Sequence, residues 1–180
     1  MTKGFIAGFL AALAVLAIGG YFFITTGGLY PGQDVKPGRF ERWAARGGLR
    51  ATIHRDTQGV KSPLEPTDEN LTAGVALYDR HCRACHGGPD GVASSIAKGL
   101  TPRAPQLAVH GVHDDPVPIT YWKIAHGIRF TGMPSYRATL SENEMWQLAL
   151  FAANMKSLPR GARAAWLREP APPAGTGDLK

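Results

Sequence analysis

The sequence predicts an all-α protein in which about three to five helices form one domain, preceded by a single membrane-spanning helix. Three observations predict this. An uncharged apolar run, Gly4–Ile24, lies near the N-terminus. Two later segments open with helix-capping residues, at Thr67 and at Ser141. The alternating apolar and polar pattern of a strand is not found, and neither is an internal repeat.

The apolar run is long enough to cross a bilayer, since residues 4–24 would span roughly 31 Å as a helix. A cleaved signal peptide is the alternative, but its apolar region usually has only about 7–15 residues. We therefore expect residues 1–25 to be a retained anchor. Only Lys3 precedes the run, whereas seven Lys and Arg lie within residues 36–61. The positive-inside rule alone would thus place the C-terminal side in the cytoplasm.

Residues 26–66 contain many Pro, Gly and Arg residues and are expected to be a linker. Four arginines recur there at the spacing of one helical face: Arg39, Arg42, Arg46 and Arg50. Gly47 and Gly48 are expected to break any long helix. Two interpretations remain open, a solvated linker and a short interfacial helix that rests on anionic headgroups or on a partner subunit.

Residues 67–158 are expected to form the domain. Thr67 begins its first helix as the N-cap, followed by acidic residues in the first turn. A short helix is predicted from Pro118 to His126, between proline-rich loops. The capping box at Ser141 begins a last helix with four core-facing residues: Met145, Leu148, Ala149 and Ala152. Residues 159–180 end in a Pro- and Gly-rich stretch and are predicted to be a mobile tail.

The charge distribution excludes one large class of partner. The chain has 20 Lys and Arg against 14 Asp and Glu, a net charge of +6. Residues 67–158 carry eight basic and eight acidic side chains, so the excess lies in the flanking segments. A nucleic-acid-binding domain concentrates Lys and Arg on its own surface. We therefore expect no nucleic-acid partner.

Cys82–His86 reads Cys-Arg-Ala-Cys-His, the pattern of covalent haem attachment. Thiols three residues apart on one helical turn can bond the two vinyl groups of a porphyrin, and His86 then lies under the iron. A zinc site would need a distant fourth ligand, because no second Cys pair exists. A redox pair would follow a strand, and a disulfide here would be strained. The sequence therefore predicts one haem c, bound through Cys82 and Cys85.

Met133 is the predicted second ligand of the iron. Haem iron in electron-transfer proteins is often ligated by His and Met. Met133 follows His86 by 47 residues and lies between Gly132 and Pro134, which favours a rigid loop over a core position. His126, seven residues before Met133, is the alternative ligand.

These motifs resemble the class I c-type cytochromes, in particular bacterial members with one haem and a membrane anchor. The resemblance covers residues 67–158 and implies a cytochrome c fold around one covalently bound haem. In that family a small residue and an aromatic residue on the first helix cross an aromatic residue on the last. Gly74 and Tyr78 match the first pair, and Phe151 matches the second aromatic residue, with Trp146 as a further candidate.

The resemblance implies further cofactor-binding residues. Pro105 and Leu107 match a Pro-x-Leu segment in which the proline carbonyl accepts a hydrogen bond from the ligating histidine; Pro102 is the alternative. Trp122 lies in a segment similar to the helix that lines the haem. Arg129 either pairs with a haem propionate or is simply exposed.

The resemblance also implies a function, which is single-electron transfer in a respiratory chain rather than catalysis. Its expected partners are a periplasmic dehydrogenase, a bc1-type complex or a terminal oxidase. The alternatives are a haem subunit of a dehydrogenase or oxidase complex, and a haem enzyme or gas sensor with a displaceable sixth ligand. Because family members receive their haem outside the cytoplasmic membrane, we expect the haem domain in the periplasm and the anchor in the bacterial inner membrane, against the charge rule.

Overall fold

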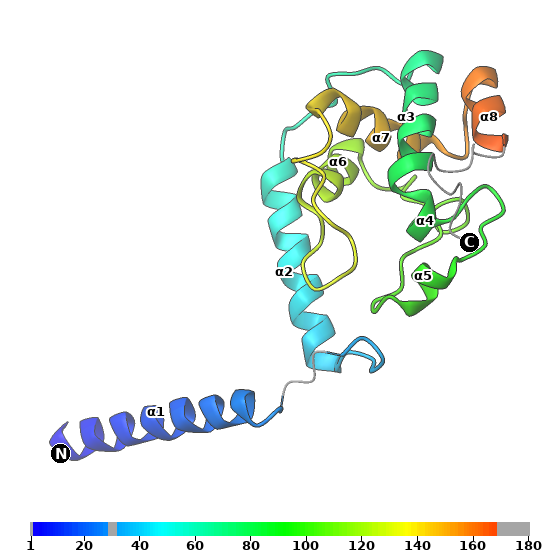
Figure 1. The fold of residues 1–180 in the computed structure, drawn as a ribbon. Coiled ribbons are helices and arrows are strands. Elements are labelled where there is room, and N and C mark those ends of the chain that lie inside the picture. The colour runs from blue at the N-terminus through cyan, green and yellow to red at the C-terminus, as the bar shows by residue number, and fades with distance from the viewer. Residues whose placement is uncertain (1, 29–31, 169–180) are drawn as a thin grey trace. The chain divides into compact units, whose positions relative to one another are not determined.

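The computed structural model describes residues 2–28 and 32–168, and every regular element in these ranges is a helix (Figure 1). The all-α prediction is therefore confirmed. The chain forms two compact units, Met1–Val35 and Lys36–Lys180.

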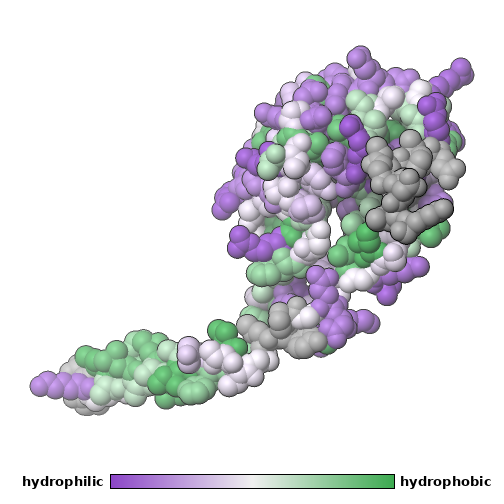
Figure 2. Space-filling model, in the orientation of Figure 1, coloured by the Kyte–Doolittle hydropathy of each residue, from purple (hydrophilic) through white to green (hydrophobic). Residues whose placement is uncertain are grey.

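The first unit contains α1, Thr2–Thr25. Its segment Lys3–Thr25 has a mean hydropathy of 2.2 and none of its most apolar stretch is buried. Figure 2 shows that apolar residues cover most of this helix. By length and composition α1 fits a membrane anchor, although an N-terminal signal sequence has the same properties.

The second unit begins with α2, Arg39–Thr57, which continues through Gly47 and Gly48. The prediction that these glycines break the helix is wrong. Each glycine costs about 1 kcal/mol relative to alanine, but the surrounding Ala, Arg and Leu residues favour a helix. The C-terminal end of α2 also packs on α6, Val117–His126, where Ile53 is buried. Tertiary contact stabilises a helix whose own sequence is marginal.

Helices α3, Asp68–His81, and α7, Glu142–Asn154, form the main packed pair. Both predicted caps are present. The Thr67 hydroxyl accepts the Asn70 N–H at 3.2 Å. Ser141 and Glu144 form the reciprocal capping box. The four predicted core residues of α7 are all buried.

The predicted crossing of the two helices occurs at Gly74. A Cβ at this position would lie against the Gln147 carbonyl oxygen and only 2.6 Å from the Phe151 Cβ. The Tyr78 and Phe151 rings meet edge to face, with centroids 5.3 Å apart. Trp146 is not part of this contact, because its indole stacks on Tyr121 at 3.9 Å.

Helix α8, Arg160–Leu167, corrects the prediction that the chain after residue 158 is a mobile tail. Pro159 provides no side-chain cap. Instead, the Asp68 carboxylate accepts the N–H groups of Gly161 and Ala162 at 3.1 and 2.6 Å. Trp166 is 5% exposed and packs on Tyr78 and Phe151. The rest of the predicted tail, residues 169–180, lies outside the described residues.

Two short helices, α4, Arg83–His86, and α5, Ser95–Gly99, follow α3. Five helices, α3–α7, thus lie within residues 67–158, in agreement with the predicted number. One apolar cluster joins α3, α6, α7 and α8, and several half-buried residues pack against it: Cys82, Tyr121, Met133 and Tyr136 among others.

Candidate haem-binding site

The two cysteines lie on one helical turn. Cys82 ends α3 and begins α4, and Cys85 lies on α4. The Cys82 carbonyl accepts the N–H groups of Cys85 and His86 at 3.1 and 2.8 Å, which closes the turn. Both thiols are free. Burial, with a smaller effect of Cys85, raises the pKa of the Cys82 thiol to about 12, so this sulfur carries its proton at neutral pH.

The His86 imidazole is fixed in one tautomer. Its Nδ1 lies 2.9 Å from the Pro105 carbonyl oxygen. A carbonyl can only accept, so Nδ1 carries the proton and donates it. Burial lowers the pKa of His86, and this hydrogen bond offsets part of that shift. The lowered pKa keeps the imidazole ring neutral. The Nε2 lone pair is therefore the one that can bind a metal. Pro105, and not the alternative Pro102, is the hydrogen-bond partner.

The segment after Pro105 holds the motif in place. The Leu107 N–H donates to the His86 carbonyl at 3.1 Å, and Leu107 is buried. The Gln106 side-chain amide donates to the Cys85 carbonyl at 3.1 Å. From α3, the Tyr78 hydroxyl donates to the Gly87 carbonyl at 2.9 Å. No role is predicted for Gln106 from the sequence, although its position between Pro105 and Leu107 was a signal that it contacts the motif.

Met133 lies in a loop closed on itself by hydrogen bonds. The Met133 carbonyl accepts the Ile128 N–H at 3.1 Å, and the Met133 N–H donates to the Thr131 hydroxyl at 3.1 Å. The Met133 side chain is half-buried and packs against the apolar cluster that also contacts Cys82. The structure thus gives Met133 a defined loop position, as its Gly and Pro neighbours predicted.

Gly127, directly after α6, allows the Met133 loop to approach closely. Its φ is +66°, and a Cβ there would lie 2.6 to 2.8 Å from backbone atoms of Met133, Pro134 and Ser135. Beyond this contact, the Ser135 hydroxyl donates to the Ala125 carbonyl at 2.6 Å. The loop is therefore held against the end of α6 by main-chain packing that only glycine permits.

Tyr136 connects the Met133 loop to the cysteine motif. Its hydroxyl donates to the His81 carbonyl at 2.7 Å. Burial, followed by the effects of the nearby Cys82 and Cys85 thiols, raises the pKa of Tyr136 to about 12. No role is predicted for Tyr136 from the sequence, although its position three residues after Met133 was a signal that it belongs to the Met133 loop.

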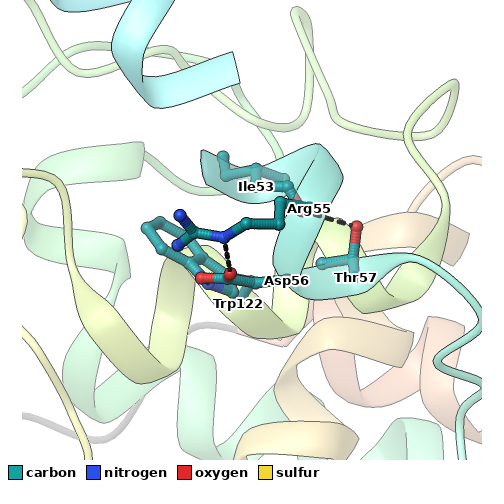
Figure 3. Close-up of polar contacts among 5 residues, drawn as sticks. All are labelled: Ile53, Arg55, Asp56, Thr57 and Trp122. Carbon is teal, nitrogen blue, oxygen red and sulfur yellow. Dashed lines mark hydrogen bonds and ion pairs between the residues drawn. The ribbon is translucent and has the colours of Figure 1, made fainter. Parts of the chain in front are cut away.

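The other residues predicted to bind the haem or its iron either contact other side chains or have no described contact that shows such a role. The Trp122 indole donates to Asp56 of α2 at 3.1 Å (Figure 3) and stacks on His126 at 4.6 Å. His126 is exposed and its Nε2 lies 3.2 Å from Arg137. Arg129 is exposed. That Trp122 lines the haem and that Arg129 pairs with a propionate both stay predictions.

The residues present fit a covalently bound haem. Such a group needs two free thiols on one helical turn, a neutral imidazole whose Nε2 can bind the iron, and a thioether on a fixed loop. The site contains all of these groups. A zinc site is not supported, because no group of three or more His, Cys, Asp or Glu residues gathers in the described part of the chain.

Residues 69–151 match the family model of cytochrome c oxidase, cbb3-type, subunit III. This segment is a c-type cytochrome domain. The matched segment runs from the first turn of α3 to Phe151 on α7 and includes the whole cysteine motif and the Met133 loop. Its presence implies electron transfer by covalently bound haem. No curated protein and no solved structure shows significant similarity to the chain.

Proposed function

We propose that this protein is a membrane-anchored, periplasmic electron carrier of a bacterial respiratory chain. Residues 1–25 would hold it in the inner membrane, and the cytochrome domain would carry one haem c bound through Cys82 and Cys85. His86 and Met133 would be the two protein ligands of its iron. The observation that carries this proposal is the His86–Pro105 hydrogen bond, which leaves His86 Nε2 as the metal-binding atom.

A haem held by these residues would supply one-electron redox chemistry. Pro105 keeps the Nδ1 proton of His86 in place and makes Nε2 a stronger donor. Met133 supplies a neutral thioether, which favours the ferrous state and raises the potential. Gly127 and Tyr136 hold the Met133 loop in position. Because both ligands are held by the fold, little rearrangement accompanies electron transfer.

Contacts of His126 support Met133 over His126 as the second ligand. The His126 ring is stacked on Trp122, and its Nε2 faces Arg137. Ligation by His126 would require both contacts to break, whereas Met133 already packs against the same apolar cluster as Cys82.

The family match favours a second candidate, in which the protein is a fixed haem subunit of a membrane oxidase complex. Gentle detergent extraction of the native membrane separates the two. A carrier is extracted alone, whereas a fixed subunit co-purifies with oxidase subunits in constant ratio.

Haem attachment and topology test the proposal together. The purified full-length chain should retain haem on a denaturing gel, and Cys82→Ser with Cys85→Ser should abolish that staining. In intact spheroplasts, external protease should digest the cytochrome domain. Haem lost under denaturing conditions, or a domain protected until the membrane is broken, would contradict the proposal.

A further inference from the structure

The N-terminal half of α2 is exposed along its length in the part of its unit that the structure describes. Every residue from Arg39 to Gly48 is exposed, and burial begins only in the C-terminal half, around Ile53. We call residues 39–48 the α2 overhang. A helical segment with two glycines and no packed face is marginal by itself. Contact with a further surface would stabilise this segment beyond what the packing of the C-terminal end on α6 provides.

The overhang has the composition of an interfacial helix. Phe40 and Trp43 are 76% and 71% exposed, and their rings lie 5.7 Å apart. Beside them are the exposed Arg39, Arg42 and Arg46, and Arg50 continues their stripe one turn further. The one acidic residue, Glu41, accepts the Gly38 N–H at the helix start. Exposed aromatic residues beside arginines are typical of helices in the headgroup region of a bilayer.

The chain itself keeps the overhang near the membrane. α1 ends at Thr25 and α2 begins at Arg39, so 13 residues, 26–38, connect them. Fully extended, they reach at most about 45 Å. A helix tethered this closely to an anchor meets the bilayer surface at a high local concentration.

We propose that the α2 overhang lies on an anionic phospholipid surface, with Phe40 and Trp43 among the headgroups and the four arginines against phosphates. This inference rests on the proposed membrane anchor. Each arginine near such a surface strengthens binding about fivefold.

Through the C-terminal end of α2, the membrane contact of the overhang affects the orientation of the cytochrome domain. Ile53 is buried, and Asp56 accepts the Trp122 indole N–H from α6, the helix that precedes the Met133 loop (Figure 3). Because α2 is one continuous helix, an overhang lying on the membrane also sets the orientation of the domain. The surface that the domain presents to redox partners is then fixed relative to the membrane.

Thiol labelling of the full-length holoprotein in lipid nanodiscs tests this. With both native cysteines bound to haem, Ala44→Cys introduces the one free thiol, four residues after Phe40 on the same helical face. We expect a neutral polyethylene-glycol maleimide to label it about tenfold more slowly in discs with anionic lipid than in zwitterionic discs. Asn143→Cys, exposed on α7, should react equally in both.

A charge-matched pair of variants identifies the cause. Replacing the four arginines (Arg39, Arg42, Arg46, Arg50) by Gln should restore fast labelling of Ala44→Cys in anionic discs. Replacing four exposed basic residues elsewhere (Lys61, Lys98, Arg160, Arg168) by Gln should leave the labelling slow.

Three results would overturn the inference, and they are distinguishable. Equal rates in both kinds of disc, with the haem protein retained in each, would reject the overhang's contact and leave the anchor intact. Failure of the wild-type protein to enter zwitterionic discs would reject the anchor and the inference with it. Protection that appears only when an oxidase complex is added would assign the overhang to a protein partner instead.

Discussion

The Tyr136 hydroxyl donates a hydrogen bond of 2.7 Å to the main-chain carbonyl of His81, across 55 positions of sequence. His81 is the last residue of α3, directly before Cys82, and Tyr136 lies three residues after Met133. The two rings also meet edge to face, with centroids 5.9 Å apart. One side chain thus joins the cysteine motif to the loop of the proposed second ligand.

Tyr136→Phe removes this hydrogen bond and leaves the ring in place. We expect a loss of about 1 kcal/mol in the free energy of unfolding of the holoprotein. The far-red band of methionine–iron coordination should also disappear at a lower temperature than in the wild type. Tyr121→Phe, whose ring stacks on Trp146, is the matched control. If both variants unfold at the same temperature and lose the far-red band at the same temperature, the Tyr136–His81 hydrogen bond does not hold the Met133 loop.

Gly127→Ala should displace the Met133 loop. A Cβ there meets the backbone of Met133, Pro134 and Ser135, and the positive φ adds strain of about 1–2 kcal/mol. Gly59→Ala is the control, because Gly59 has a similar φ of +74° with nothing within 4 Å of the added Cβ. Thermal melts and the far-red band of both variants measure the difference. A band that survives in Gly127→Ala as it does in Gly59→Ala would show that the close approach is dispensable.

Local signals and family motifs predicted the two helix caps and the hydrogen-bond partner of His86. Thr67 and Ser141 cap their helices through side chains within three residues, so the sequence displays the whole interaction. The role of the Pro105 carbonyl as the hydrogen-bond acceptor of His86 is predicted by a three-residue family motif after His86. Such features need no knowledge of the rest of the fold.

The features that sequence reasoning missed depend on contacts distant in sequence. α8 is capped by Asp68, which lies 93 and 94 residues before the N–H groups that it accepts. α2 continues past Gly47 and Gly48. Its C-terminal end is held by the hydrogen bond from the Trp122 indole to Asp56, two residues that are 66 positions apart. Proline and glycine content predicted a mobile tail for the α8 segment, and the two glycines predicted a helix break within α2. Tertiary contact outweighed both local signals.

Asp68→Ala should release the start of α8. The carboxylate caps two N–H groups of this helix, and losing it should lower the free energy of unfolding by about 1–2 kcal/mol. Limited proteolysis should then cut near Arg160 and Arg163 first. Glu69→Ala, an exposed acid one residue later, removes the same charge from the first turn of α3 without uncapping α8. Equal stability of the two variants would contradict this capping role.

The contact between α2 and α6 should weaken in acid. Hydrogen bonds from Arg55 and then from Trp122 hold the pKa of Asp56 below its ordinary value, and the nearby His126 acts in the same direction. Because the folded-state pKa is lowered, the stabilisation is complete above the ordinary Asp pKa and is lost as pH falls through the lowered one.

Hydrogen exchange of the α2 amides around Ile53 measures this pH dependence. Exchange, corrected for the intrinsic pH effect, should speed up in acid in the wild type. Asp56→Asn should already exchange faster at neutral pH and respond less to acid. Asp114→Asn, at a carboxylate that is 91% exposed, should behave as the wild type does. An unchanged acid response in Asp56→Asn would assign the effect to another group.

We propose that His86 and Met133 are the two ligands of the haem iron. The far-red absorption of the ferric full-length protein, recorded beside Met133→Ala and His126→Ala, tests it most directly. We predict the methionine–iron band in the wild type and in His126→Ala and its loss in Met133→Ala, with the c-type spectrum and covalent haem retained in all three. A wild-type protein with a c-type spectrum but without this band, or a band that survives in Met133→Ala, would show that Met133 does not bind the iron.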